Sequence, residues 1–123
     1  MKTEKPTTKI IAGKYKGKIL ELPSLDVTRS SKARLKESLF NVLQFDIIDK
    51  IFIESFAGSG SIGLEAISRG AKRAYFVELD RNSYQILLKN CKAVDMEKCQ
   101  TVQGNTFVQT PLFINFLKNS QDE

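Results

Sequence analysis

Two acidic residues and a group of glycines have a spacing that could bind a nucleotide-like cofactor. Glu54 lies four positions before Gly58, and Glu78 lies twenty positions after it. The segment Gly58–Gly63 has the spacing G-x-G-x-x-G, in which glycines allow a backbone to approach a ligand closely. Carboxylates beside such a loop can accept hydrogen bonds from ribose hydroxyls or pair with an ammonium group. These residues therefore predict a cofactor site.

The elements expected around these residues are those of a βαβ unit. The apolar run Ile51–Ile53 predicts a short buried strand before the glycines. The segment after the glycines predicts a helix that ends at Gly70, because glycine readily adopts the left-handed conformation of a C-cap. Arg73–Val77 predicts a second strand, which ends directly before Glu78. This order of elements makes the glycine spacing informative.

The chain continues with the same alternation of helix and strand. A second helix is expected to begin at Asn82 or Ser83, and a third strand is expected over Gln100–Gln103. Long helical connections place such strands parallel, in the order 3-2-1. We therefore expect an α/β fold with half of a Rossmann-like, doubly wound sheet.

The C-terminal segment is expected to form one more helix. Thr110 and Pro111 predict an N-cap followed by proline at the first helical position, and hence a helix over Leu112–Asn119. No strand-like segment follows, so the sheet is expected to be truncated before a fourth strand. We expect the chain to be the N-terminal fragment of a longer fold; a compact protein with a reduced sheet is the alternative.

The N-terminal segment predicts a basic hairpin followed by a helix. Two β-prone runs, Lys9–Ala12 and Lys16–Leu22, surround a glycine-containing turn. Three lysines are expected on the turn and the exposed face of this hairpin: Lys14, Lys16 and Lys18. Ser30 or Ser31 is expected to cap the helix, with Lys36 on its polar side.

The positive charge is concentrated in the first third of the chain. Residues 1–36 contain ten Lys and Arg residues against three acids, whereas residues 37–123 contain nine against eleven. A basic segment attached to a nearly neutral body suggests a polyanionic partner, nucleic acid in the first place. A basic arm that only aids solubility is the alternative.

The remaining composition indicates an ordinary globular protein without a metal centre. Cys91 and Cys99 have neither metal-ligand nor redox spacing, and the chain has no His. Cys91 fits the apolar face of a helix and is expected to be a core thiol. No apolar run has the length of a membrane span, and no signal peptide is recognisable, so we expect a cytoplasmic protein without membrane contact.

Glu54 distinguishes between two cofactor classes that fit the glycine loop. A dinucleotide would place its pyrophosphate at the loop and the helix N-terminus, where a carboxylate would repel it. S-adenosylmethionine (SAM) carries an ammonium group, whose attraction to a carboxylate at ~4 Å is about 4 kcal/mol at an effective dielectric of about 20. Glu78 could accept ribose hydroxyls of either ligand, and Asn105 could meet the adenine amino group. The sequence therefore favours SAM.

Longer motifs make a family resemblance specific. The segment ESFAGSGSIGLEA at 54–66, followed by SRGA at 68–71 and FVE at 76–78, resembles the small-subunit (16S) ribosomal RNA guanine-N2 methyltransferases. Upstream, IIAGKYKGK at 10–18 is similar to the opening hairpin of that family. The segment TRSS at 28–31, Arg34 and LFNVL at 39–43 are similar to its T-R-P-T…R…L-F-N-x-L helix start. The resemblance covers about Lys9 to Asn105.

The resemblance implies a class I, SAM-dependent enzyme that methylates the exocyclic N2 amine of a guanine in small-subunit rRNA, free or in an assembling subunit. It implies that Glu54 and Glu78 hold the methionine ammonium and the ribose, with Asn105 near the adenine. The other cofactor-binding residues predicted are Phe56, Ala57, Gly58, Gly60, Gly63 and Leu79. The RNA-binding residues predicted are Lys14, Lys16, Lys18, Arg29 and Arg34. Segment 1–7 is then a disordered start, 8–45 an RNA-facing extension and 46–123 the SAM-binding half-domain.

One departure from the family pattern concerns the chemistry itself. The family's Asp/Asn-Pro-Pro-aromatic motif, which orients the target amine, has no counterpart, since the only prolines are Pro6, Pro23 and Pro111. No catalytic residue is therefore assigned. The alternatives are a non-catalytic RNA-binding module or inactive fragment and, less favoured because of Glu54, an NAD-dependent oxidoreductase.

Overall fold

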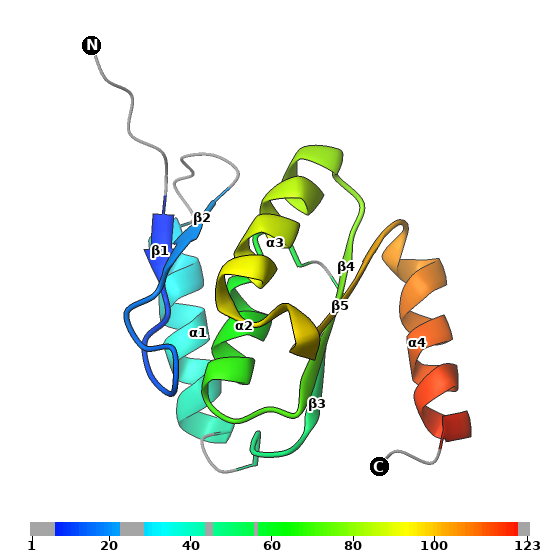
Figure 1. Cartoon of the computed structure of the whole chain (residues 1–123), viewed down its shortest axis with the longest axis horizontal. Helices are drawn as coiled ribbons and strands as arrows, with labels where there is room; N and C mark the ends of the chain where they lie inside the picture. Colours follow the sequence, from blue (N-terminus) through cyan, green and yellow to red (C-terminus); the bar gives the residue numbers. More distant parts are fainter. Residues whose placement is uncertain (1–6, 23–28, 44–45, 56, 121–123) are drawn as a thin grey trace.

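The computed structural model describes residues 7–22, 29–43, 46–55 and 57–120. This part of the chain forms an N-terminal hairpin, a parallel sheet and helices on both faces of that sheet (Figure 1). The expected disordered start at 1–7 lies outside the described residues except for Thr7, which begins the first strand.

The sheet has the predicted order and direction. Its strands are β3 (Ile51–Glu54), β4 (Arg73–Glu78) and β5 (Cys99–Gln103). They pair in parallel in the order β3-β4-β5. The α/β fold with half of a Rossmann-like sheet is therefore confirmed, and all three strands end at the same edge.

Figure 1 shows how the helices cover this sheet. The hairpin and three helices lie on one side of the sheet, and the last helix lies on the other side. The helices are α1 (Arg29–Leu43), α2 (Ser61–Ser68), α3 (Arg81–Val94) and α4 (Thr106–Ser120), with the short 3₁₀ helix η1 (Met96–Lys98) before β5. Such an arrangement follows from right-handed crossovers that change sides after β5.

The hairpin is shorter than predicted. It consists of β1 (Thr7–Lys9) and β2 (Ile19–Glu21), which pair antiparallel, instead of runs over Lys9–Ala12 and Lys16–Leu22. The reason is that the connecting loop uses its backbone donors elsewhere: the N–H groups of residues 11 and 12 donate to a side chain of α2. The prediction was correct in topology and wrong in length.

Two of the predicted helix starts differ from the structure by one to three residues. Helix α1 begins at Arg29, so Ser30 and Ser31 lie within the helix and do not cap it. Helix α3 is capped by Asp80, whose carboxylate accepts from the Ser83 N–H at 2.8 Å. That hydrogen bond lowers the pKa of the Asp80 carboxyl. By contrast, the predicted end of α2 is confirmed, since Gly70 has a left-handed backbone (φ 114°).

The predicted start of α4 at Thr110 and Pro111 is wrong. The Oδ1 of Asn105 accepts from the Phe107 N–H at 2.7 Å, so the helix already begins at Thr106. Pro111 therefore lies inside the helix, where it donates no backbone hydrogen bond. The hydroxyl of Thr110 contacts that of Thr106 at 2.8 Å and donates to Ser55 at 3.2 Å. Thr110 thus attaches α4 to the end of β3 instead of capping a helix.

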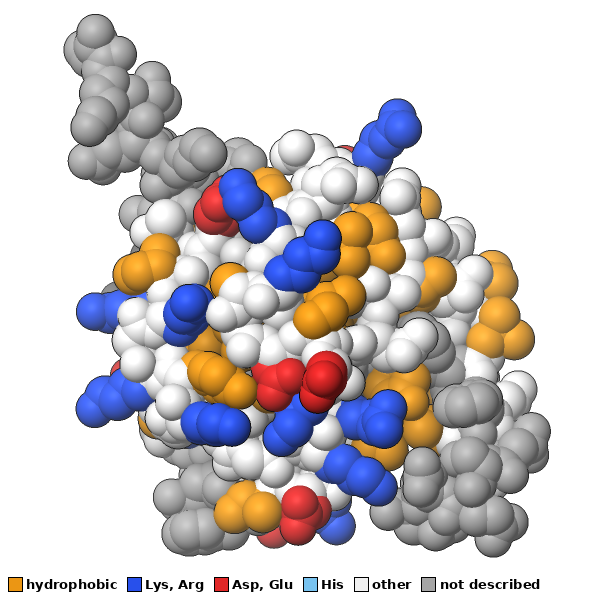
Figure 2. Space-filling view, in the orientation of Figure 1, with side chains coloured by type: hydrophobic (Ala, Val, Ile, Leu, Met, Phe, Trp, Pro, Cys, Tyr) orange, Lys and Arg blue, Asp and Glu red, His pale blue; other side chains and the backbone are white. Residues whose placement is uncertain are grey.

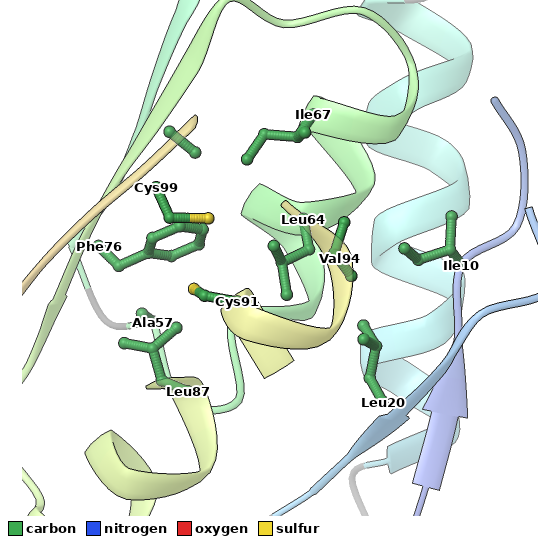
Figure 3. Close-up of a cluster of buried hydrophobic side chains, with 11 residues drawn as sticks. Ile10, Leu20, Ala57, Leu64, Ile67, Phe76, Leu87, Cys91, Val94 and Cys99 are labelled. Atoms are coloured by element: carbon green, nitrogen blue, oxygen red, sulfur yellow. The ribbon is translucent and has the colours of Figure 1, made fainter. Parts of the chain in front are cut away.

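The main core lies between the sheet, helices α2 and α3, and the hairpin (Figure 3). Two hairpin residues, Ile10 and Leu20, are buried in it together with residues of the βαβ unit. The full cluster is Ile10, Leu20, Ala57, Leu64, Ile67, Ala74, Phe76, Leu87, Cys91, Val94 and Cys99. Because burial of one large apolar side chain contributes roughly 1.5–3 kcal/mol, the hairpin is integral to the fold.

Both thiols belong to this core, which confirms Cys91 as a core residue. Cys91 and Cys99 are free and buried, and the Cys99 thiol donates to the Asp95 carbonyl at 3.3 Å. The hydrogen bond with Cys99, together with burial, raises the pKa of the Cys91 thiol. We expect neither thiol to react with Ellman's reagent in the native protein, and both to react in denaturant. Rapid reaction of a folded sample would contradict this core arrangement.

A buried carboxylate connects the hairpin to helices α1 and α2. Glu65 is fully buried and accepts from the backbone N–H groups of Ile11 at 2.9 Å and Ala12 at 3.1 Å. It also accepts from the Arg69 Nε at 2.8 Å and pairs with the Lys36 Nζ at 3.5 Å. These hydrogen bonds and the two positive charges thus offset the free-energy cost of burying the Glu65 carboxylate.

Lys36 corrects the expectation of a polar, solvent-facing position. Its side chain is 2 % exposed and donates to the Lys9 carbonyl at 3.3 Å. Burial lowers the pKa of the Lys36 ammonium, and Glu65 opposes that effect. The helical periodicity placed Lys36 away from the leucine stripe, but it did not reveal that the hairpin covers that side.

The apolar character of α4 continues onto its outer surface. Phe107, Val108, Leu112 and Ile114 are exposed, and Figure 2 shows orange side chains on the side that carries α4. Nevertheless, no helix in the described ranges has the length and apolar character that a membrane span requires.

Candidate cofactor site

A small cavity lies where β3, β4 and β5 end. Its volume is about 160 Å³. It is lined by Ser55, Glu78, Leu79, Gly104, Asn105, Thr106 and Phe107. The structure thus brings together three of the predicted cofactor residues, Glu78, Leu79 and Asn105. The carboxyl edge of a parallel sheet is where ligands bind in open α/β folds.

Glu78 links the glycine loop to the end of β4. Its Oε1 accepts from the Gly58 N–H at 2.7 Å, and its Oε2 accepts from the Asp80 N–H at 2.9 Å. Its backbone carbonyl accepts from the Gly104 N–H at 3.0 Å, which attaches the end of β5. Each carboxylate oxygen has a second lone pair. Glu78 can therefore hold the loop and still accept hydrogen bonds from a ligand.

Glu54 occupies the N-terminus of α2. Its Oε1 accepts from the Gly63 N–H at 3.1 Å, which is one of the helix amides without an intrahelical partner. The carboxylate is half-buried at the end of β3. A negative charge therefore already lies at the positive end of the helix dipole.

The three glycines of the loop have different roles. A Cβ at Gly58, where φ is 55°, would meet no atom within 4 Å, so this residue borders open space. A Cβ at Gly60 or Gly63 would overlap the side chains of Leu87 and Phe76 respectively. Gly58 is therefore the glycine that a ligand could approach, whereas Gly60 and Gly63 allow α2 and α3 to pack closely on the sheet.

Of the other two predicted loop residues, the structure describes one. Ala57 is buried in the core, and its N–H donates to the Val77 carbonyl at 3.0 Å, which carries the loop over the end of β4. Phe56 lies outside the described residues.

Phe107 and Ser55 are cavity residues that the sequence reasoning missed. Phe107 is 80 % exposed and Leu79 is 66 % exposed, and both line the cavity with Glu78. Asn105, predicted to meet adenine, uses its Oδ1 to cap α4. The signal that could have revealed Phe107 is its place two residues after the strand-end Asn105, which the expected start of α4 at Thr110 obscured.

The three predicted RNA-binding lysines do not line the cavity. Lys14, Lys16 and Lys18 are exposed in the loop between β1 and β2, and Figure 2 shows Lys and Arg side chains spread over the face in view, including the side that carries the hairpin. The Lys14 ammonium lies 5.4 Å from the centre of the Tyr15 ring. Arg29 and Arg34 belong to α1, and their side chains lie outside the described ones.

Comparison with known proteins assigns the chain to a family. The family model described as conserved hypothetical protein 95 matches residues 8–115, which covers the hairpin, the glycine loop and most of α4. The chain belongs to this family. Curated proteins similar to the chain include ribosomal RNA small subunit methyltransferases D. This confirms the family resemblance that the sequence motifs indicated.

Two of these relatives show how much of their own length the chain matches. It is 38% identical over 119 residues to the methyltransferase D of Haemophilus influenzae, covering 97% of this chain and 59% of the relative. It is 38% identical over 97 residues to that of Escherichia coli K12, covering 79% and 49% respectively. The chain thus spans about half the length of these relatives.

Solved structures show the same fold. A proposed methyltransferase from Escherichia coli matches with a TM-score of 0.73 at 37% identity, covering 82% of this chain and 54% of that one. A hypothetical protein from Thermus thermophilus matches with a TM-score of 0.68 at 28% identity, covering 94% and 64%. Both structural matches cover most of the chain and support the α/β fold.

Proposed function

We propose that this chain binds SAM at the carboxyl edge of its sheet and forms the cofactor-binding half of a methyltransferase that acts on ribosomal RNA. The observation that carries this proposal is the position of Glu54, whose carboxylate accepts from an N-terminal amide of α2. The names of the relatives, ribosomal RNA small subunit methyltransferase D, support the reaction class.

Glu54 opposes a dinucleotide and favours a ligand with a positive charge. A pyrophosphate at the glycine loop would need the helix N-terminus, where the Glu54 carboxylate now lies. Two negative groups at one helix end would repel each other, whereas the ammonium and sulfonium of SAM would be attracted. The NAD-dependent oxidoreductase is therefore the weaker alternative.

The cavity chemistry fits the adenosine part of such a cofactor. Glu78 offers lone pairs for ribose hydroxyls, while Leu79 and Phe107 offer apolar surface for a planar base. The cavity, with a volume of about 160 Å³, would hold part of such a ligand. The open space next to Gly58 would hold the rest. When bound, SAM supplies an activated methyl group on its sulfonium. The role of the protein is to hold this group in a fixed place and direction.

The proposed substrate is the exocyclic N2 amine of a guanine in small-subunit rRNA, presented as free RNA or within an assembling subunit. The exposed lysines of the hairpin support an RNA partner. The motif that would orient the amine is not present in the sequence, so we assign cofactor binding to this chain and leave the catalytic position unassigned.

Photolabelling with methyl-tritiated SAM tests the cofactor class. We expect ultraviolet light to attach label to the folded chain, and S-adenosylhomocysteine to compete at far lower concentration than NAD⁺. A chain that is labelled equally well in the presence of excess S-adenosylhomocysteine, or protected better by NAD⁺, would contradict the proposal.

Adding small-subunit rRNA tests the reaction: label recovered as N2-methylguanine would show that the amine is oriented without the family motif.

The hairpin lysines predict a salt-dependent affinity for RNA. Replacing Lys14, Lys16 and Lys18 together by alanine is expected to weaken binding and to reduce the slope of log K against log salt by roughly 0.7 per lysine for single-stranded RNA. Filter binding over a series of salt concentrations measures both quantities. The matched control replaces three other exposed lysines, Lys50, Lys98 and Lys118. Equal losses in the two triple variants would show that only net charge matters.

A further inference from the structure

One buried side chain joins the basic hairpin to the glycine loop. Asn90 of α3 is 3 % exposed, and its side chain makes three hydrogen bonds, none of them to its own helix. Its Oδ1 accepts from the Glu21 N–H at 3.0 Å, and its Nδ2 donates to the Glu21 carbonyl at 2.9 Å. The same Nδ2 donates to the Ser59 carbonyl at 2.9 Å.

These contacts place one amide between two elements with different proposed roles. Towards Glu21, Asn90 pairs as a neighbouring strand would, because it satisfies both backbone groups of one residue of β2. An ion pair between Lys89 and Glu21, at 2.8 Å, reinforces this contact. Towards Ser59, it holds the peptide unit in the middle of the glycine loop.

The Ser59 peptide is a position where the loop needs support. It lies between Gly58 and Gly60, and both glycines have positive φ angles of 55° and 83°. Glycine has few steric restrictions, so adjacent glycines permit rotation of the peptide units between them. The Ser59 carbonyl and the Gly60 N–H belong to one peptide unit, and this N–H donates to the Ala57 carbonyl at 2.8 Å. A rotation would break that bond and so release the neighbouring Ala57–Gly58 peptide unit, whose N–H donates to Glu78.

We propose that Asn90 is a positioning residue that fixes the glycine loop in its ligand-binding conformation and couples that loop to the hairpin. The affinity part of this inference rests on the proposed cofactor function. The conformational part does not, because it concerns the protein without ligand. By linkage, an RNA that stabilises the hairpin would favour the cofactor-binding loop, and the cofactor would favour the docked hairpin by the same factor.

Hydrogen exchange measured by NMR on the ligand-free chain tests the conformational part. We compare wild type with Asn90→Ser, which is small and neutral, and Asn90→Asp, which retains the acceptor for Glu21 and removes both donated bonds. The control is Tyr84→Phe on the same helix, which loses one hydrogen bond, the 3.0 Å contact with Thr101. Core amides such as that of Phe76 report global opening.

In both Asn90 variants, we expect the Gly58 and Gly60 amides to exchange about tenfold faster, as the loss of one hydrogen bond would cause. The Glu21 amide, which has its own bond to Asn90, is expected to exchange faster in Asn90→Ser. The Phe76 amide should change no more than in Tyr84→Phe. Faster exchange of all amides to the same extent, or unchanged loop amides, would overturn the proposal.

Calorimetry with S-adenosylhomocysteine tests the affinity part on the same samples. We expect about tenfold weaker binding by Asn90→Ser and unchanged binding by Tyr84→Phe. If wild type binds no ligand, the proposed cofactor function fails while the exchange data still decide the role of Asn90. If wild type and Asn90→Ser bind equally, the positioning role is wrong and the cofactor function stands.

Discussion

Glu65→Ala is expected to lower the free energy of unfolding by about 3–5 kcal/mol, because removing one member of a buried charge cluster leaves its partners uncompensated. The Lys36 ammonium would remain buried without the carboxylate that lies 3.5 Å from it. The N–H groups of Ile11 and Ala12 would lose their acceptor as well. A loss of this size is a large fraction of the roughly 5–15 kcal/mol that stabilises an ordinary domain.

The matched control for Glu65→Ala is Lys36→Met. Methionine retains the buried aliphatic volume, and Glu65 keeps Arg69 and two backbone donors. We therefore expect this variant to lose about 1 kcal/mol or less. Urea unfolding followed by circular dichroism measures both values, since the chain has no Trp for fluorescence. A Glu65→Ala protein as stable as Lys36→Met would contradict the described cluster.

Glu78→Gln is expected to weaken binding of S-adenosylhomocysteine by about 10- to 100-fold, because hydrogen bonds to a charged group contribute roughly 1.5–3 kcal/mol. Glutamine retains an oxygen that can accept from the Gly58 N–H, so the loop should stay in place. The substitution removes the charge that we expect to hold the ribose hydroxyls. The effect is measured as the shift of the thermal unfolding midpoint at increasing ligand concentration.

The control for Glu78→Gln removes the same charge elsewhere. Glu97 is exposed in η1 and does not line the cavity. Glu97→Gln should therefore show the ligand-induced shift of the wild type. Equal shifts in wild type and both variants would exclude a role of Glu78 in binding.

The βαβ unit could be predicted from the sequence because its signals are local. The apolar run of β3, the glycine spacing, the end of α2 at Gly70 and the strand before Glu78 each depend on a few adjacent residues. The parallel order of the strands then follows from the handedness of helical crossovers. The site at the carboxyl edge follows from the same topology.

The predictions that were wrong concern features that depend on tertiary contacts or on competing local signals. The Thr110-Pro111 pair has the form of a helix start, but the Asn105 side chain caps the helix five residues earlier. The burial of Lys36 could not be predicted, because it requires a carboxylate twenty-nine positions away and a hairpin that covers both. Periodicity within one helix contains no information about such partners.

The candidate site was predicted in part for the same reasons. Glu78 ends β4, Leu79 follows it, and Asn105 lies two residues after β5, so topology alone brings them to one cavity. The packing roles of Gly60 and Gly63 depend on side chains of Leu87 and Phe76, which the glycine spacing does not specify. Asn90 gave no sequence signal, since a single polar residue in an amphipathic helix does not reveal contacts with two distant backbones.

We claim that this chain contains a working SAM site, and calorimetric titration of the folded chain with S-adenosylhomocysteine measures such a site. We predict saturable binding at one site per chain, lost in Glu78→Ala and unaffected in Glu97→Gln. A folded wild-type chain that releases no heat and shows no change of unfolding midpoint with ligand would contradict the claim.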